Sequence, residues 1–209
     1  LYSKQKDPIT DYLYNEGLLF AMIGKAYQFA NQTIYVDTDN ILAGQEATEY
    51  LYQLGHRKIG YIGYEKALLF SSDRKYGYQL AHFEHGLPLQ EDYSIEINDS
   101  MKKMPPKLSD LLKRPGRPTA FVVTDDFLGV ALERTCRECG LTVPEDLSII
   151  SFNNSLFAQM TSPPLTSIDI NSMQLGEEAA TQIIKHMENP NLASTKIIVP
   201  HKIVMRESC

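Results

Sequence analysis

Residues 36–63, VDTDNILAGQEATEYLYQLGHRKIGYIG, contain one complete unit of strand end, polar turn, helix, basic turn and second strand. The polar turn, residues 37–40, follows an apolar run directly, as expected where a strand ends and a helix begins. Small and apolar residues then recur every three or four positions until Gly55, which is typical of the residue that ends a helix. In a parallel sheet, a turn of this kind lies at the edge where ligands bind.

The same alternation of strands and helices continues along the chain. Strands are expected at residues 18–23, 34–36, 59–62, 93–97, 120–123, 148–152, 196–199 and 202–205. Helices are expected from residue 8 to the stop at Gly17, between residues 40 and 55, and at residues 72–85, 107–113, 127–139 and 172–187. Strands separated by helices at this spacing predict an α/β fold with a parallel sheet covered on both faces.

The composition excludes several classes of protein. With 209 residues, 43% of them hydrophobic and 22% charged, the chain can bury a sizeable core. A net charge of −6 disfavours nucleic-acid binding by this chain alone, because phosphate contacts need a basic face. A local basic cluster is interpreted as a solvated helix and loop. It consists of Lys102, Lys103, Lys107, Lys113, Arg114 and Arg117.

No apolar run is long enough to cross a bilayer, and the first ten residues do not resemble a signal peptide. We therefore expect no membrane partner and a cytoplasmic location. Cys136 and Cys139 have the spacing of a zinc or redox motif, but a structural zinc needs four ligands and no second pair exists. Buried thiols are the favoured interpretation, and we expect neither a metal nor a cofactor.

Enzyme motifs are also missing: the sequence has no glycine-rich dinucleotide loop, no phosphate loop and no nucleophile elbow. Asp125 and Asp126 could suggest a glycosidase, but neighbours at a helix start cannot flank one bond from opposite faces. His56 and Arg57 lie in a turn at the opposite edge, where a packing role with the imidazole bonded to nearby backbone is expected. We therefore predict that the chain is not an enzyme.

Polar side chains follow the expected strands wherever a strand ends. They are Asp37, Asp39, Asn40, Asn98, Asp99, Asp125, Asp126, Asn153 and Asn154. Together with Arg74, such carboxylates and amides match the donors and acceptors of a neutral polyhydroxyl ligand, such as a sugar, better than a phosphate. Asp and Asn also cap helices. For Asp37, Asp39 and Asn40 we favour capping, with Asp39 or Asn40 as the cap.

Four blocks of this sequence resemble the effector-binding core of the lac repressor and gal repressor family. They are Asp39-Asn40 with Gly44, Ala47, Leu51 and Gly55-His56-Arg57; Arg74 with Gly77-Tyr78; Thr124-Asp125-Asp126, residues 140–148 and Phe152-Asn153-Asn154; and residues 163–168 with Leu175-Gly176 and Ala179-Ala180. The segments 34–40, 23–25 and 151–154 are most similar to maltose operon repressors of Gram-positive bacteria. The blocks occur in the family's order and span most of the chain.

The resemblance implies a periplasmic-binding-protein-like fold: two doubly wound parallel-sheet domains joined by three crossings, the first domain incomplete here. Residues 1–36 and 169–194 would form the partial N-terminal subdomain, and residues 37–168 and 195–209 the C-terminal one. The helix-turn-helix headpiece that binds operator DNA in the family is absent from this chain. The implied partners are a sugar effector, a second copy in a homodimer, and operator DNA through that headpiece.

The resemblance also places ligand-binding roles on particular residues. Arg74, Asp125 and Asn153 match family positions that contact the effector, and Phe70 and Asp99 lie near positions that line the pocket. Many relatives have Asp where this chain has Asn153, and an amide would not pair ionically with Arg74. The implied function is the sugar-binding and dimerisation core of a repressor of maltose or related carbohydrate genes. A sugar-binding protein of a transport system is the alternative, and an enzyme acting on a sugar is the third.

Overall fold

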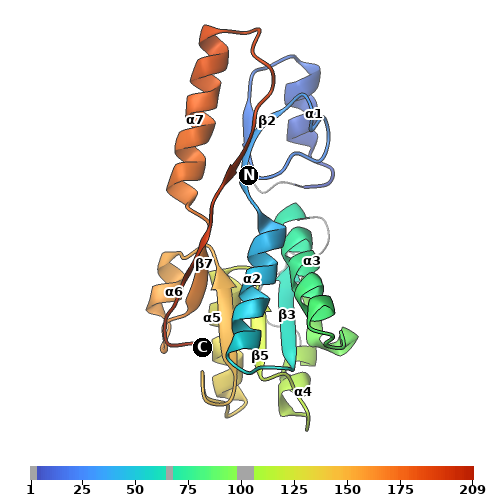
Figure 1. Ribbon diagram of the computed structural model, residues 1–209, viewed down its shortest axis with the longest axis vertical. Coiled ribbons are helices and arrows are strands. Elements are labelled where there is room, and N and C mark those ends of the chain that lie inside the picture. The colour runs from blue at the N-terminus through green and yellow to red at the C-terminus, as the bar shows by residue number, and fades with distance from the viewer. Residues whose placement is uncertain (1–3, 65–67, 98–105) are drawn as a thin grey trace.

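The computed structural model describes residues 4–64, 68–97 and 106–209, and arranges them as two units stacked along the long axis (Figure 1). The smaller unit is built on a three-stranded sheet in the order β1-β2-β8, and the larger one on a six-stranded sheet in the order β4-β3-β5-β6-β7-β9. Both sheets are parallel except for the last strand of the larger one. The predicted α/β architecture is confirmed.

The smaller unit has a parallel sheet formed by β1 (Ala21–Ile23), β2 (Ile34–Thr38) and β8 (Lys196–Val199). Helices α1 (Pro8–Asn15) and α7 (Ser172–Glu188) lie on opposite sides of β2 (Figure 1). The side chain of Asp7 accepts a hydrogen bond from the amide of Ile9, so α1 begins as the Asp-Pro pair predicts. Apolar residues of α7 pack on β2 and β8 to form a small core.

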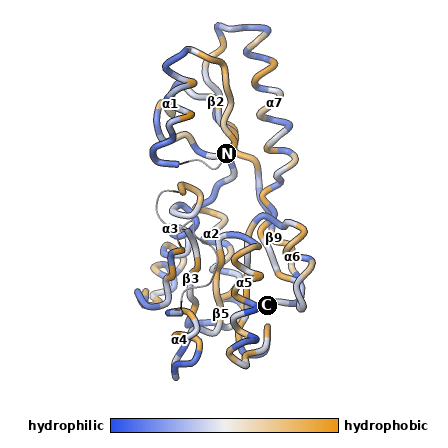
Figure 2. Tube along the Cα trace, turned by 180° about the vertical axis from the view of Figure 1, so that it is seen from behind, coloured by the Kyte–Doolittle hydropathy of each residue, from blue (hydrophilic) through white to orange (hydrophobic). Residues whose placement is uncertain are grey.

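The larger unit contains the main core. Its strands are β3 (Ile59–Tyr64), β4 (Ser94–Ile97), β5 (Ala120–Val123), β6 (Ser148–Phe152), β7 (Thr166–Asp169) and β9 (Lys202–Val204). Its helices are α2 (Asn40–Gln53), α3 (Leu69–Glu84), α4 (Pro106–Lys113), α5 (Asp126–Glu138) and α6 (Leu156–Met160), with a 3₁₀ turn at Glu91–Tyr93. Figure 2 shows the hydrophobic runs of β3 and β5 in the interior of this unit.

Side chains alternate across the larger sheet, as its pleat requires. On β5, Phe121 and Val123 join a core with residues of α4 and α5, whereas Ala120 and Val122 join a second core with residues of α2 and α3. Both faces of the sheet are therefore covered by helices, which explains why β5 is a continuous apolar run and why every residue of β5 and β6 is buried.

Helices α2 and α3 pack backbone against backbone at two glycines. A Cβ atom on Gly44 would lie 2.3 Å from the carbonyl oxygen of Arg74, and one on Gly77 would lie 2.0 Å from that of Ile41. No side chain fits at either position without moving a helix. This contact fixes the position of α3 relative to α2, and with it the position of Arg74.

Three segments cross between the units: one leads from β2 into α2, one from β7 into α7, and one from β8 into β9. Hydrogen bonds join these crossings to one another. Thr38 Oγ1 donates to the carbonyl of Val199 at 3.0 Å, and the side-chain amide of Asn171 donates to the carbonyl of Pro200 at 2.7 Å. Asn171 has a φ of 53°, so the chain turns sharply where α7 starts.

The structure corrects several expectations. Residues 195–209 were expected wholly in the larger unit, but β8 pairs with β2 in the smaller sheet, so only the end of the chain from β9 onward belongs to the larger sheet. The expected buried strand at residues 18–23 is limited to β1, an edge strand whose Ile23 is 47% exposed. Helix α6 and strand β7 were not expected, and β9 runs antiparallel to β7.

Candidate ligand-binding site

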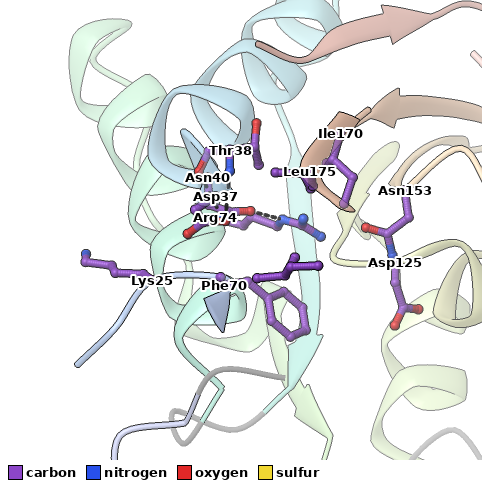
Figure 3. A pocket seen from close by; sticks show the side chains of 12 residues that line it. Lys25, Asp37, Thr38, Asn40, Phe70, Arg74, Asp125, Asn153, Ile170 and Leu175 are labelled. Atoms are coloured by element: carbon purple, nitrogen blue, oxygen red, sulfur yellow. Dashed lines mark hydrogen bonds between the residues drawn. The ribbon is translucent and has the colours of Figure 1, made fainter. Parts of the chain in front are cut away.

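A cavity of about 330 Å³ lies between the two units, at the carboxyl ends of the strands. Its lining comes from both units and from the crossings between them. The lining residues are Ile23, Gly24, Lys25, Asp37, Thr38, Asn40, Phe70, Arg74, Asp125, Asn153, Ile170 and Leu175 (Figure 3). Cavities of this kind, apolar with a few convergent polar groups, bind small molecules.

Four of the five residues predicted to bind ligand line this one cavity: Phe70, Arg74, Asp125 and Asn153. Phe70 and Arg74 come from α3, and Asp125 and Asn153 come from the segments that follow β5 and β6, far away in the sequence. The fifth, Asp99, lies outside the described residues. The sequence thus predicted side chains that the fold brings together, and their part in ligand binding stays a prediction.

Arg74 is held in a fixed orientation although only 2% of it is exposed. Its Nε donates to Asn40 Oδ1 at 2.8 Å, and its Nη1 donates to the carbonyl of Thr124 at 2.5 Å. The guanidinium carbon lies 4.2 Å from the ring centre of Phe152 and 5.0 Å from that of Phe70. No described residue accepts a hydrogen bond from Nη2, and Figure 3 shows the guanidinium directed across the cavity.

Burial lowers the pKa of Arg74 to about 10, so the guanidinium stays charged at neutral pH. The charge is partly balanced by nearby groups, among them Asp125 and Asp37. A buried cation with one free donor edge can bind a hydroxyl or an acceptor oxygen strongly, because hydrogen bonds from charged donors are the stronger ones.

Asp125 combines a structural role with a place on the cavity wall. Its Oδ1 accepts from the amide of Leu128 at 2.8 Å, so it is the N-cap of α5, and its Oδ2 accepts from the hydroxyl of Tyr64 at 2.5 Å. Burial raises the pKa of Asp125 above its ordinary value. Tyr64 was not singled out from the sequence, since a tyrosine at the end of a strand carries no distinctive signal.

The three polar residues of the first turn do different things. Asp39 is the N-cap of α2, accepting from the amide of Leu42 at 2.9 Å, as expected. Asp37 and Asn40 line the cavity, although we favoured capping over ligand binding for this group, with Asn40 as the alternative cap. The Asn40 amide links Asp37 Oδ1, at 3.1 Å, to Arg74, and burial raises the pKa of Asp37.

Asn153 lies in a tight turn that directs its side chain into the cavity. Its φ is 93° and that of Asn154 is 46°, both in the left-handed region that asparagine tolerates better than most residues. The backbone N–H of Asn153 donates to the carbonyl of Ile168 at 2.8 Å, and this bond joins the turn to β7. In Figure 3, the Asn153 amide and the Arg74 guanidinium face each other.

The smaller unit supplies cavity residues that sequence reasoning did not assign to the site. Ile23 ends β1, Gly24 and Lys25 follow it, and Leu175 lies in the first turn of α7. Lys25 also forms an ion pair with Asp73 of α3 at 3.2 Å, which joins the two units beside the cavity. The available signals were that residues 23–25 lie at the end of an expected strand and that this segment resembles maltose operon repressors.

Other candidate groups have structural roles. His56 bonds to the hydroxyls of Thr119 and Ser148, at 2.9 and 3.0 Å, rather than to backbone as we expected, and burial lowers its pKa. Cys136 is buried and Cys139 half-buried, and both thiols are free. Across the described ranges, no group of three or more metal-ligating side chains comes together, and no helix is long and apolar enough to span a membrane.

Comparison with known proteins agrees with this geometry. Residues 48–209 match the family described as periplasmic binding protein-like domain. The transcriptional regulator LacI from Bacillus cereus subsp. cytotoxis is 36% identical, with a TM-score of 0.91 over all of this chain and 74% of that one. A complex of the regulator CelR with cellobiose is 26% identical, with a TM-score of 0.91 over all of this chain and 64% of that one.

The HTH-type transcriptional regulator MalR of Staphylococcus xylosus is 29% identical over 208 residues. The match takes in the whole of this chain but only 60% of that regulator's length. These relatives are transcriptional regulators and not enzymes. The chain therefore belongs to the periplasmic binding protein-like domain family, in the form found as the effector-binding core of LacI-type transcriptional regulators.

Proposed function

We propose that this chain is the effector-binding and dimerisation core of a sugar-responsive transcriptional repressor of maltose or related carbohydrate genes. The observation that carries the proposal is the orientation of Arg74. Its buried guanidinium is fixed on one edge by Asn40 and Thr124, and its Nη2, which bonds no residue that the structure describes, is directed across the cavity toward Asn153 (Figure 3). A transport protein or an enzyme is the weaker reading, since the relatives compared are regulators.

The balance of charges in the cavity favours a neutral ligand. Arg74 and Lys25 are offset by Asp37 and Asp125, and Asn153 adds an amide with both a donor and an acceptor. The remaining walls are apolar and suit the C–H faces of a sugar ring. A volume of about 330 Å³ is near the lower end for small-molecule sites, which favours a mono- or disaccharide over a longer oligosaccharide.

The likeness to regulators suggests how binding is transmitted. Because the cavity walls belong to both units, a ligand that contacts both favours the arrangement in which those walls are closest. It can shift that equilibrium only by its difference in affinity for the two arrangements. In the complete protein, a cytoplasmic homodimer would pass this shift to DNA-binding headpieces on operator DNA.

The identity of the sugar rests on two further likenesses. The segments at residues 23–25, 34–40 and 151–154 resemble maltose operon repressors, and all three contribute cavity residues directly. One relative of similar structure is the CelR complex with cellobiose. We therefore propose a disaccharide, with maltose as the first candidate and cellobiose as the second.

A thermal-shift screen against mono- and disaccharides tests the proposal. A sugar that binds the native state at one hundred times its Kd is expected to raise the melting temperature by about 5 °C or more. Glucose 6-phosphate serves as the anionic control and is expected to give a smaller shift. If no neutral sugar raises the melting temperature while an anionic metabolite does, the sugar proposal is wrong.

Removing the Asn153 side chain is expected to weaken sugar binding by about tenfold, since losing a buried polar partner costs about 1–3 kcal/mol. Asn153→Ala would also strain a backbone with positive φ, whereas Asn153→Gly removes the same amide without strain. Because both variants lack the side-chain amide, calorimetric titration should give the same loss of sugar affinity for both. Asn31→Ala, an exposed site in the smaller unit, is the control, and equal affinities in all four proteins would rule Asn153 out as a contact.

Breaking the Lys25–Asp73 pair is expected to weaken sugar binding by about twofold to fivefold, because a partly exposed ion pair contributes at most about 1 kcal/mol. The pair joins the two units, so its loss favours a more open cavity. The test is a charge swap. Lys25→Asp or Asp73→Lys alone should weaken binding, and the double variant should recover it at low salt. If the double variant bound the sugar as weakly as the single variants, the ion pair would not act across the cavity.

A further inference from the structure

Asp126 is a buried carboxylate that does not line the cavity but directly follows Asp125, which does. Only 2% of the residue is exposed. Its Oδ1 accepts hydrogen bonds from Ser151 Oγ at 2.6 Å and Ser167 Oγ at 2.7 Å, and its Oδ2 accepts from the amide of Ser155 at 2.6 Å. These three donors belong to β6, to β7 and to the turn that follows β6.

The turn that carries Asn153 depends on this carboxylate twice. The Ser155 amide binds Asp126 directly, and the amide of Asn154 donates to Ser167 Oγ at 3.0 Å, whose own hydroxyl proton goes to Asp126. Asn153 and Asn154 both have positive φ, a conformation that persists only when the surrounding structure holds it. Asp126 therefore holds this turn directly at Ser155 and, through Ser167, at Asn154.

The same residue is tied to Asp125 by the chain itself. Asp125 is the N-cap of α5 and Asp126 is the first residue of that helix. One side chain thus fixes the start of α5 relative to the turn after β6. We propose that Asp126 is the positioning residue that sets the spacing of Asp125 and Asn153 across the ligand cavity. The effect of Asp126 on ligand binding rests on the proposed function. Its effect on the turn rests only on the hydrogen bonds described above.

Two substitutions at Asp126 separate positioning from general stability. Asp126→Ala removes the acceptor for three donors. Asp126→Asn keeps the shape of the side chain. Its amide oxygen can accept from the backbone N–H of Ser155, and its amide nitrogen can donate to the hydroxyl oxygens of Ser151 and Ser167 once these hydroxyls rotate. Asp146→Ala is the matched control, because Asp146 also accepts an amide and a hydroxyl, both from Thr142, in an exposed turn at the other end of α5.

The first measurement needs no ligand. Amide hydrogen exchange of the 209-residue chain, read by NMR, is expected to show at least tenfold faster exchange at residues 153–155 in Asp126→Ala, with the strand amides of Ile149 and Ile150 unchanged. Asp126→Asn should restore most of the protection, and Asp146→Ala should leave it intact. Unchanged exchange at residues 153–155, or an equal increase throughout the chain, would overturn the proposal.

The second measurement is the affinity for maltose or cellobiose, whichever binds the wild type more tightly, well below the melting temperature. Asp126→Ala is expected to bind at least tenfold more weakly, Asp126→Asn within about threefold of wild type, and Asp146→Ala equally well. Wild-type affinity in Asp126→Ala would refute the positioning role. If the wild type binds neither sugar, the choice of sugar fails, while the exchange result still decides whether Asp126 holds the turn.

Discussion

Arg74→Ala is expected to weaken binding of the sugar by tenfold to about a hundredfold, since a hydrogen bond from a charged donor contributes about 1.5–3 kcal/mol. The effect should exceed that of any other single change in the cavity. The guanidinium is the buried cation of the site, and its removal also leaves Asn40 Oδ1 and the Thr124 carbonyl without their donor. Isothermal titration with maltose and cellobiose measures the loss.

Arg57→Ala is the matched control for this experiment. Arg57 also donates to two backbone carbonyls, those of Tyr52 and His56, and stacks on a ring at 3.9 Å, but it lies in the turn that enters β3 at the opposite edge of the sheet. Its loss should leave the affinity unchanged. Arg74→Lys should bind poorly as well, because an ammonium cannot reproduce the planar fork that bonds Asn40 and Thr124. Full affinity in Arg74→Ala would show that the ligand binds elsewhere.

Gly77→Ala is expected to lower the melting temperature by about 6–12 °C, the shift that corresponds to about 3 kcal/mol of overpacking in a chain of this length. The added Cβ would lie 2.0 Å from the carbonyl oxygen of Ile41, so α3 must move away from α2. Because Arg74 lies on the same helix, sugar affinity should fall together with stability. Thermal unfolding and titration measure the two effects.

A glycine elsewhere in the chain provides the opposite expectation. Gly176 is inside α7, and a Cβ there would meet no atom within 4 Å. Gly176→Ala should therefore stabilise the protein by about 0.5–1 kcal/mol through better helix propensity. If Gly77→Ala melted at the wild-type temperature, the close α2–α3 contact would be misplaced.

Most of the larger unit could be predicted because its pattern is strong. Strand β5 is a continuous apolar run, β6 has Ile149, Ile150 and Phe152 between clear turn signals, and the bounds of both strands agree with those expected. Strand β7 was missed because its buried residues Thr166 and Ser167 are polar and bond to neighbours within the core. Helix α6 has only five residues, too few for a helical period to appear.

The site was predicted in part. Polar residues after strands are visible in the sequence, so Asp125 and Asn153 were among the candidates together with Arg74. The family resemblance then gave a ligand-binding role to these three residues and added Phe70. The sequence could not show that Asn40 orients Arg74 or that Tyr64 bonds Asp125, because both contacts join segments that only the fold brings together. The contribution of the smaller unit was missed for the same reason.

A crystal structure of this chain grown with the most stabilising sugar would show where the ligand binds. We expect one sugar between the two units, with a hydroxyl bonded to Arg74 Nη2 and others within hydrogen-bond distance of Asp125 and Asn153. Sugar bound on the outer surface of either unit, or a filled cavity in which Arg74 makes no contact with the ligand, would contradict it.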